Sequence, residues 1–161
     1  MYRIYLYYSR IIQLIKILFI KCLYLKKCNI NYSLRFRNNF NIIIEEQGYL
    51  EIGRNCFFNH ACSISCLGNI QIGENCLFGE NVKIYDHNHK YTDRSQLIVK
   101  QGFSIGKINI GNNCWIGSNV IILKDVVIGD NVVIGADCLI YHSIPSNAIV
   151  KLKQEIYINR V

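Results

Sequence analysis

Isoleucine recurs at every sixth position through the last third of the chain. From Ile110 to Ile140 the phase holds without a slip, giving the hexads IGNNCW, IGSNVI, ILKDVV, IGDNVV, IGADCL and IYHSIP. Glycine follows the isoleucine in four of these hexads, and the fifth position is always Cys, Val or Ile. The same pattern appears earlier in hexads that begin at Ile52, Phe58, Ile64, Ile72 and Phe78, with two extra residues between Ile64 and Ile72.

A six-residue period is neither the period of a helix nor the alternation of a simple strand. It is typical of a solenoid whose flat sides are short strands joined by tight turns, with the repeated isoleucine pointing inward. Three hexads predict one triangular coil, so IGNNCW should stack against IGDNVV, and IGSNVI against IGADCL. Glycine and asparagine recur where the backbone must turn, and they tolerate left-handed dihedrals best. We therefore predict an all-β solenoid over residues 44–150.

Residues 1–43 form a distinct apolar and basic segment, which we expect to be partly helical. Residues 2–30 are aliphatic, tyrosine-rich and basic, without the small-residue cleavage site of a secretory signal. A transmembrane helix needs about 20 mostly apolar residues, and Lys16 and Lys21 interrupt this stretch. Two interpretations stay open: a segment that covers the end of the core or packs on a partner subunit, and one that lies on an anionic membrane. Residues 151–161 form a C-terminal tail.

The cysteines indicate a packed core and not a disulfide framework. Five of the eight occupy the fifth position of a hexad, where a small, nearly apolar side chain fits the core: Cys56, Cys62, Cys76, Cys114 and Cys138. No CxxC occurs, so we expect no structural zinc and no bound metal. A reducing cytoplasm fits this usage, with peripheral placement at the inner face of the membrane if the N-terminal segment contacts lipid.

The net charge of +7 raises the question of an anionic partner. Nucleic acid, anionic lipid and a phosphorylated ligand all suit a basic chain. The sequence lacks the interleaved basic and aromatic pattern that would favour nucleic acid, so we expect none.

The stretch IYDHNHK, residues 84–90, interrupts the repeat. The hexad phase breaks directly after Ile84 and resumes at Ile108, which leaves residues 86–106 as a long excursion loop. Solenoids place functional insertions on one face in this way. His87 and His89 therefore stand at the base of a loop held by a rigid coil, beside Asp86. A metal site, a catalytic base and a solvated turn are all compatible with these letters.

The repeat together with IYDHNHK and NNCWIG resembles the hexapeptide-repeat acyltransferases over roughly residues 44–150. IGNNCWIGSNVIILKDVVIGDNVVIGADCLI looks like the galactoside, maltose and polysaccharide O-acetyltransferase branch. The resemblance implies a left-handed parallel β-helix and a homotrimer. It also implies acetyl-CoA as co-substrate and a carbohydrate acceptor, both bound in clefts between subunits.

The resemblance also implies roles for individual residues. A catalytic histidine stands five residues after the last in-phase aliphatic residue in related enzymes; here this is His89, with His87 as the alternative. A neutral imidazole can take the acceptor's proton as the hydroxyl attacks the thioester, and Asp86 is a candidate to orient a ring or contact the acceptor. The other carry-overs are Asn59 and Trp115 for the acceptor, and Trp115, Ser118 and Ala136 for CoA.

Two departures from the family pattern concern the CoA site. His142 stands where the family often has a lysine, and the usual Ala-Gly-x-Pro-Ala-Lys after NAIV is missing. Lys151, Lys153 and Arg160 are the remaining cations that can meet the CoA phosphates.

We therefore expect an acetyl-CoA-dependent O-acetyltransferase acting on a sugar hydroxyl, of a surface polysaccharide or its precursor. The alternatives are N-acetylation of an amino sugar, O-acetylation of serine, and a non-catalytic β-helical binding or assembly module. No nucleophile elbow occurs, so direct transfer is favoured over an acyl-enzyme.

Overall fold

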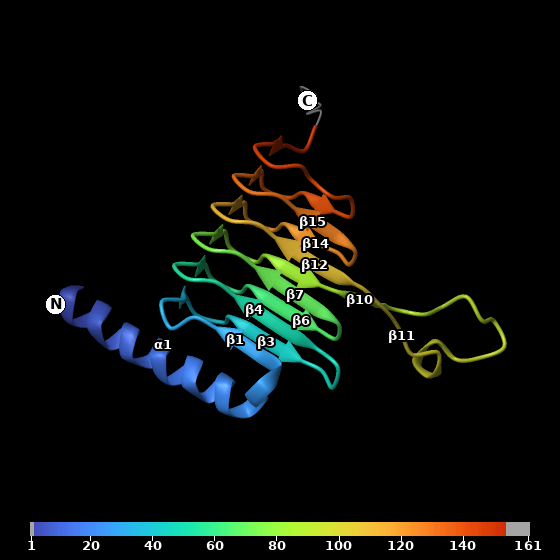
Figure 1. The fold of residues 1–161 in the computed structure, drawn as a ribbon, viewed down its shortest axis with the longest axis horizontal. Helices are drawn as coiled ribbons and strands as arrows, with labels where there is room; N and C mark the ends of the chain where they lie inside the picture. The colour runs from blue at the N-terminus through green and yellow to red at the C-terminus, as the bar shows by residue number, and fades with distance from the viewer. Residues whose placement is uncertain (1, 154–161) are drawn as a thin grey trace, which may run out of the picture.

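The computed structural model describes residues 2–153, and it shows a parallel β-solenoid with one long helix at its N-terminal end (Figure 1). The chain winds through three flat parallel sheets, and each turn before the last adds one strand to every sheet. The predicted all-β fold, a left-handed parallel β-helix with an N-terminal helix and a long excursion, is confirmed.

The strands of the three sheets follow each other in rotation along the chain as far as Ile140, after which the isolated Ile128–Ile144 bridge stands in the place of a sheet 1 strand. Sheet 1 contains β1 (Cys28–Ile30), β4 (Tyr49–Ile52), β7 (Asn69–Ile72), β12 (Lys107–Ile110) and β15 (Val126–Ile128). Sheet 2 contains β2 (Arg35–Phe36), β5 (Phe57–Phe58), β8 (Leu77–Phe78), β13 (Trp115–Ile116), β16 (Val133–Ile134) and β18 (Ile149–Val150). Sheet 3 contains β3 (Asn41–Ile44), β6 (Ser63–Cys66), β9 (Lys83–Tyr85), β14 (Ile121–Ile122) and β17 (Leu139–Ile140).

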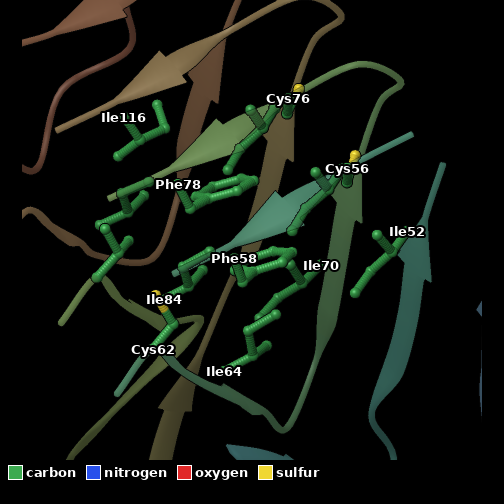
Figure 2. Close-up of a cluster of buried hydrophobic side chains, with 14 of the residues drawn as sticks. Ile52, Cys56, Phe58, Cys62, Ile64, Ile70, Cys76, Phe78, Ile84 and Ile116 are labelled. Carbon is green, nitrogen blue, oxygen red and sulfur yellow. The ribbon is translucent and has the colours of Figure 1, made fainter. Parts of the chain in front are cut away.

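The register of the coils is the one that the hexads predict. Ile110 pairs with Ile128, and Ile116 with Ile134, so equivalent positions stack along the solenoid axis. These isoleucine side chains are buried in the interior. In the same core, Phe58 and Phe78 stack with ring centroids 4.1 Å apart (Figure 2). All eight cysteines are free, and the five hexad cysteines are buried.

Asparagine and glycine have different roles in the turns, whereas the sequence pattern predicted left-handed dihedrals for both. Asparagine, aspartate or alanine takes the left-handed conformation at the corners, for example Asn113 with φ 54° and Asn131 with φ 56°. Among the described residues, Gly102 in the excursion is the only glycine with positive φ. The hexad glycines are required by close approach instead, because a Cβ on Gly117 would lie 2.6 Å from the backbone nitrogen of Ala136.

The solenoid begins earlier than predicted. α1 (Tyr2–Tyr24) and the 3-10 turn η1 (Leu25–Lys27) lead directly into β1, which pairs with β4, so a first coil precedes residue 44. This coil lacks the isoleucine–glycine signature, and its core positions are Ile30, Leu34, Phe36 and Ile44. Ile17 of α1 is fully buried against that end of the core. In residues 2–153 no helix combines the length and apolarity needed to cross a membrane.

The predicted excursion at about residues 86–106 is a β-hairpin that projects from the side of the solenoid (Figure 1). β10 (His87–His89) pairs antiparallel with β11 (Phe103–Ile105), and the short 3-10 helix η2 (Ile98–Lys100) lies in the distal loop. The hairpin leaves the coil after β9 and returns at β12, so its root lies between sheets 3 and 1.

Candidate functional site

Asp86 fixes the root of the hairpin. Its side chain is fully buried, and its two carboxylate oxygens accept hydrogen bonds from the backbone N–H groups of Leu67 and Gly68, each at 2.8 Å. Its backbone carbonyl accepts from the N–H of Gly106 at 2.7 Å. The hairpin is thereby tied both to the preceding coil and to its own returning strand.

His87 is held by the same carboxylate. Its Nδ1 lies 2.9 Å from Oδ1 of Asp86, and its side chain is only 16% exposed. Donation from Nδ1–H to the carboxylate leaves Nε2 as the acceptor nitrogen of a neutral ring. The ring also meets Phe103 edge-on, with centroids 5.2 Å apart. Two contacts therefore restrain His87.

His89 stands on the same face of the short strand, since residues two apart in a strand point the same way. It is exposed, and its ring packs against Phe103 at a centroid distance of 4.5 Å. Within residues 2–153, its ring nitrogens make no hydrogen bond. The two imidazoles thus share Phe103 as a support, and His89 is the one open to a ligand.

A cavity of about 480 Å³ opens beside the hairpin root, lined among others by Gly68, Asn69, Ile105 and Lys107. Asp86 itself does not reach this space, because both of its oxygens are occupied and its side chain is buried. The contacts of Asp86 in this chain are those of a residue that orients the His87 ring and holds the hairpin root.

Sequence reasoning missed three members of this site: Leu67, Gly68 and Phe103. The two extra residues between Ile64 and Ile72 were visible in the repeat, and this longer step contains the Leu67–Gly68 corner that binds Asp86. Phe103 lies in the excursion, where the repeat gives no register, so only the hairpin pairing places it opposite His89.

Trp115 and Asn59, which were predicted to contact the acceptor, lie in sheet 2 and directly after one of its strands, respectively. Trp115 points outward from β13, is 57% exposed and is flanked by Leu77 and Val133 in the neighbouring strands. Asn59 follows β5, and its side-chain oxygen accepts from the backbone N–H of His60 at 2.9 Å. This hydrogen bond holds the Asn59 side chain against the backbone of the next residue.

Three of the predicted CoA residues line up at the corner between sheets 2 and 3. The Ser118 hydroxyl accepts from the N–H of Glu80 at 3.1 Å, Ala136 stacks on Gly117, and Lys151 follows on the next coil. His142 lies instead at the corner that follows sheet 3, beside the Tyr141 ring. Lys153 is exposed, and Arg160 lies outside the described residues.

The predicted site residues thus form two groups at opposite ends of the sheet 3 strands. Asn59, Ser118 and Ala136 precede these strands, and Lys151 occupies the same corner in the last coil. The hairpin histidines follow β9, and His142 follows β17. One chain brings His87 and His89 together with Asp86, but it does not bring them to Trp115. In the described part of the chain, no three His, Cys, Asp or Glu side chains gather in a way that could hold a metal ion.

Comparison with known proteins supports the repeat and the fold. The bacterial transferase hexapeptide family (six repeats) matches residues 107–142, and the hexapeptide repeat of succinyl-transferase matches residues 69–84. A hexapeptide-repeat acetyltransferase from Vibrio cholerae superposes with a TM-score of 0.65 at 22% identity, over 74% of this chain and 65% of that one.

Two further solved structures share more sequence. A galactoside acetyltransferase in complex with coenzyme A is 33% identical, with a TM-score of 0.57, over 73% of this chain and 54% of that one. A maltose O-acetyltransferase from Clostridium difficile 630 is 32% identical, also with a TM-score of 0.57, over 78% of this chain and 62% of that one. This chain therefore spans just under two thirds, or less, of these three proteins. The resemblance to the hexapeptide-repeat acyltransferases, including the galactoside and maltose branch, is confirmed.

Proposed function

We propose that this protein is an acetyl-CoA-dependent O-acetyltransferase that acetylates a sugar hydroxyl, in a surface polysaccharide or its precursor. The observation that carries the proposal is the histidine-bearing hairpin, anchored by a buried carboxylate and mounted on a solenoid that is 32–33% identical to galactoside and maltose O-acetyltransferases. A solenoid needs neither the hairpin nor its histidines in order to stack its coils.

His89 is the proposed general base. It takes the proton of the acceptor hydroxyl as that oxygen attacks the thioester carbonyl; the carbon–sulfur bond then breaks, and His89 returns the proton to the thiolate. The exposure of His89 and its support by Phe103 favour this role. His87 and Asp86 hold the hairpin in place from the buried side. His87 is the alternative base, because its Nε2 also remains free to accept a proton.

The acyl donor is proposed to lie along the corner of Ser118 and Ala136. The stacked Gly117 and Gly135 and the small side chains next to them leave a wall that a narrow pantetheine chain can approach closely. Trp115 lies two residues from Gly117 on the outer face of sheet 2. Lys151 and Lys153 are proposed to meet the CoA phosphates, together with His142 of a neighbouring subunit, since His142 lies at the corner after sheet 3.

A homotrimer is part of the proposal, because one chain leaves the site incomplete. His89 lies after sheet 3, and Trp115 and Ser118 lie before it. A cleft between two subunits can join the hairpin of one chain to the Ser118 corner of its neighbour.

Peripheral contact with an anionic membrane is proposed for α1, which presents apolar side chains on its outer face in addition to Ile17, which it buries against the core. Two of its polar side chains also reach the solenoid: Gln13 donates to the Phe36 carbonyl at 2.8 Å and Lys21 to the Ile30 carbonyl at 2.9 Å. Its outer face exposes a row of large apolar or aromatic side chains: Tyr7, Tyr8, Ile11, Ile12, Ile15, Leu18, Phe19 and Leu23. Such a face, with basic residues at its borders, suits a lipid interface.

The test of the activity is release of free CoA thiol from acetyl-CoA with a panel of mono- and oligosaccharide acceptors, with and without chelator. We expect acceptor-dependent, chelator-resistant turnover that falls about 100-fold or more in His89→Ala. Asn88→Ala, between the two histidines, is the matched control and should retain turnover. Loss only in His87→Ala would transfer the base to that residue. Absence of acetyl-CoA binding by calorimetry would refute the acetyltransferase.

A further inference from the structure

The excess positive charge of the protein resides entirely in its N-terminal part. Residues 1–44 hold eight of the eighteen Lys and Arg residues and none of the eleven Asp and Glu residues, so the remaining chain carries ten basic and eleven acidic side chains. The folded protein therefore concentrates its net charge of +7 on α1 and the first coil.

Several of these cations surround one cavity. A space of about 630 Å³ lies between α1 and the first two coils, with Lys16 on the helix side and Arg35, Arg37 and His60 on the solenoid side. Gln13 adds an amide to the wall. No Asp or Glu lines this cavity among the described residues.

The cations around this cavity are not neutralised by the protein. Within residues 2–153, the salt bridges of Lys and Arg are Arg54–Glu74 and Lys124–Asp125, and both lie elsewhere. Lys16 lies 6.0 Å from the ring centre of Phe36, and Arg37 lies 5.9 Å from that of Phe57. These aromatic rings support the cations without cancelling their charge.

Arg10, which lies near Arg35, is also affected by the positive charge around this cavity. Arg10 donates to the backbone carbonyls of Leu34 and Tyr32, and no carboxylate of residues 2–153 forms a hydrogen bond or salt bridge with it. Its burial and, secondly, the charge of Arg35 lower the pKa of Arg10. Like charges gathered around a hollow repel one another, so this arrangement favours an anion in the hollow.

We propose that the cavity between Lys16, Arg35 and Arg37 binds the phosphate group of a phosphate-bearing ligand. Two guanidinium groups offer forked donors that match phosphate oxygens, and a lysine adds a point charge. The cavity is larger than a single phosphate needs, which leaves room for a second phosphate or a head group. The proposal requires no acyl transfer and stands independently of the proposed activity.

The phosphate has two possible sources that the structure makes accessible. A soluble ligand, such as a nucleoside diphosphate, can enter the cavity from solution. A phospholipid or a lipid-linked sugar phosphate can enter from a bilayer, because Tyr8 and Ile12 of the apolar face of α1 also line the cavity. The chemistry recognised is the same in both cases.

The first arm of the test is calorimetric titration of the full chain with sodium pyrophosphate at fixed ionic strength. We expect saturable binding that is weakened about tenfold or more in Arg35→Gln/Arg37→Gln, given the strength of charged hydrogen bonds. The control Arg54→Gln/Arg94→Gln removes two exposed arginine charges away from the cavity and should change affinity less than about twofold. Lys16→Gln tests the helix side separately. Circular dichroism verifies that each variant is folded.

The second arm distinguishes the two sources by sedimentation with phosphatidylglycerol vesicles, with and without pyrophosphate. If pyrophosphate releases the protein from the vesicles, and the cavity variant binds them less than the control, the lipid supplies the phosphate. If pyrophosphate binds the cavity but leaves vesicle binding unchanged, the ligand is soluble. Absence of pyrophosphate binding, or equal weakening in both double variants, overturns the proposal. None of these readouts depends on turnover.

Discussion

Replacement of Asp86 by asparagine should destabilise the whole solenoid and not only the hairpin. The buried carboxylate accepts hydrogen bonds from Leu67 and Gly68 and contacts the His87 ring. Asparagine has nearly the same shape but keeps one acceptor oxygen, and its amide NH2 would face a backbone N–H donor. One of these backbone donors then loses its partner inside the protein.

The size of this effect follows from the number of donors affected. A buried donor left without a partner costs about 1–3 kcal/mol, and a hydrogen bond to a charged acceptor contributes about 1.5–3 kcal/mol. Loss of one charged hydrogen bond and weakening of the other two predict about 2–4 kcal/mol. Since domains of this kind have about 5–15 kcal/mol of total stability, the change is large.

The assay is equilibrium unfolding in urea, with the free energy of unfolding extrapolated to water. Asp93→Asn is the matched control: Asp93 also accepts from a backbone N–H, that of Ser95 at 2.9 Å, but it is exposed in the hairpin loop. The control should unfold at the wild-type midpoint. A loss below about 0.5 kcal/mol in Asp86→Asn would show that Asp86 is not a structural anchor.

Three further predictions concern packing and the cysteines. Gly117→Ala should lower the free energy of unfolding by about 1–3 kcal/mol, because the added Cβ would lie 2.6 Å from the backbone of the next coil. Gly135→Ala should be tolerated, because the atom nearest to its Cβ is 3.4 Å away. Equal unfolding midpoints for the two variants would contradict this prediction. A thiol reagent should label Cys22 rapidly and the seven buried cysteines only on unfolding, so Cys22→Ser should abolish the fast phase. Burial and, secondly, the charge of Asp86 raise the pKa of Cys66 to about 12 from 9.0. The folded state therefore disfavours the thiolate form of Cys66. The protonated thiol contributes its full stabilisation below pH 9, and this contribution is lost as the pH rises toward 12. In Cys66→Ala, the free energy of unfolding should fall less steeply over this alkaline range.

The sequence alone determined the repeating part of the fold. A coil can stack on the next only if equivalent residues face inward. Isoleucine at every sixth position meets this requirement. The pairings Ile110–Ile128 and Ile116–Ile134 could therefore be predicted from spacing. The excursion was visible for the same reason, because it breaks the phase after Ile84.

Features without a local periodic signal were decided by tertiary structure. The first coil begins at Cys28 and has no isoleucine–glycine signature. It is held in the solenoid by the pairing of β1 with β4 of the next coil. The glycines serve close approach between coils, which depends on atoms up to 39 residues away, as between Gly79 and Ser118. The link from Asp86 to Leu67 and Gly68 and the cation-lined cavity beside α1 likewise join residues distant in sequence. A six-residue repeat fixes which residues face inward, but only the packed coils bring distant polar groups into contact.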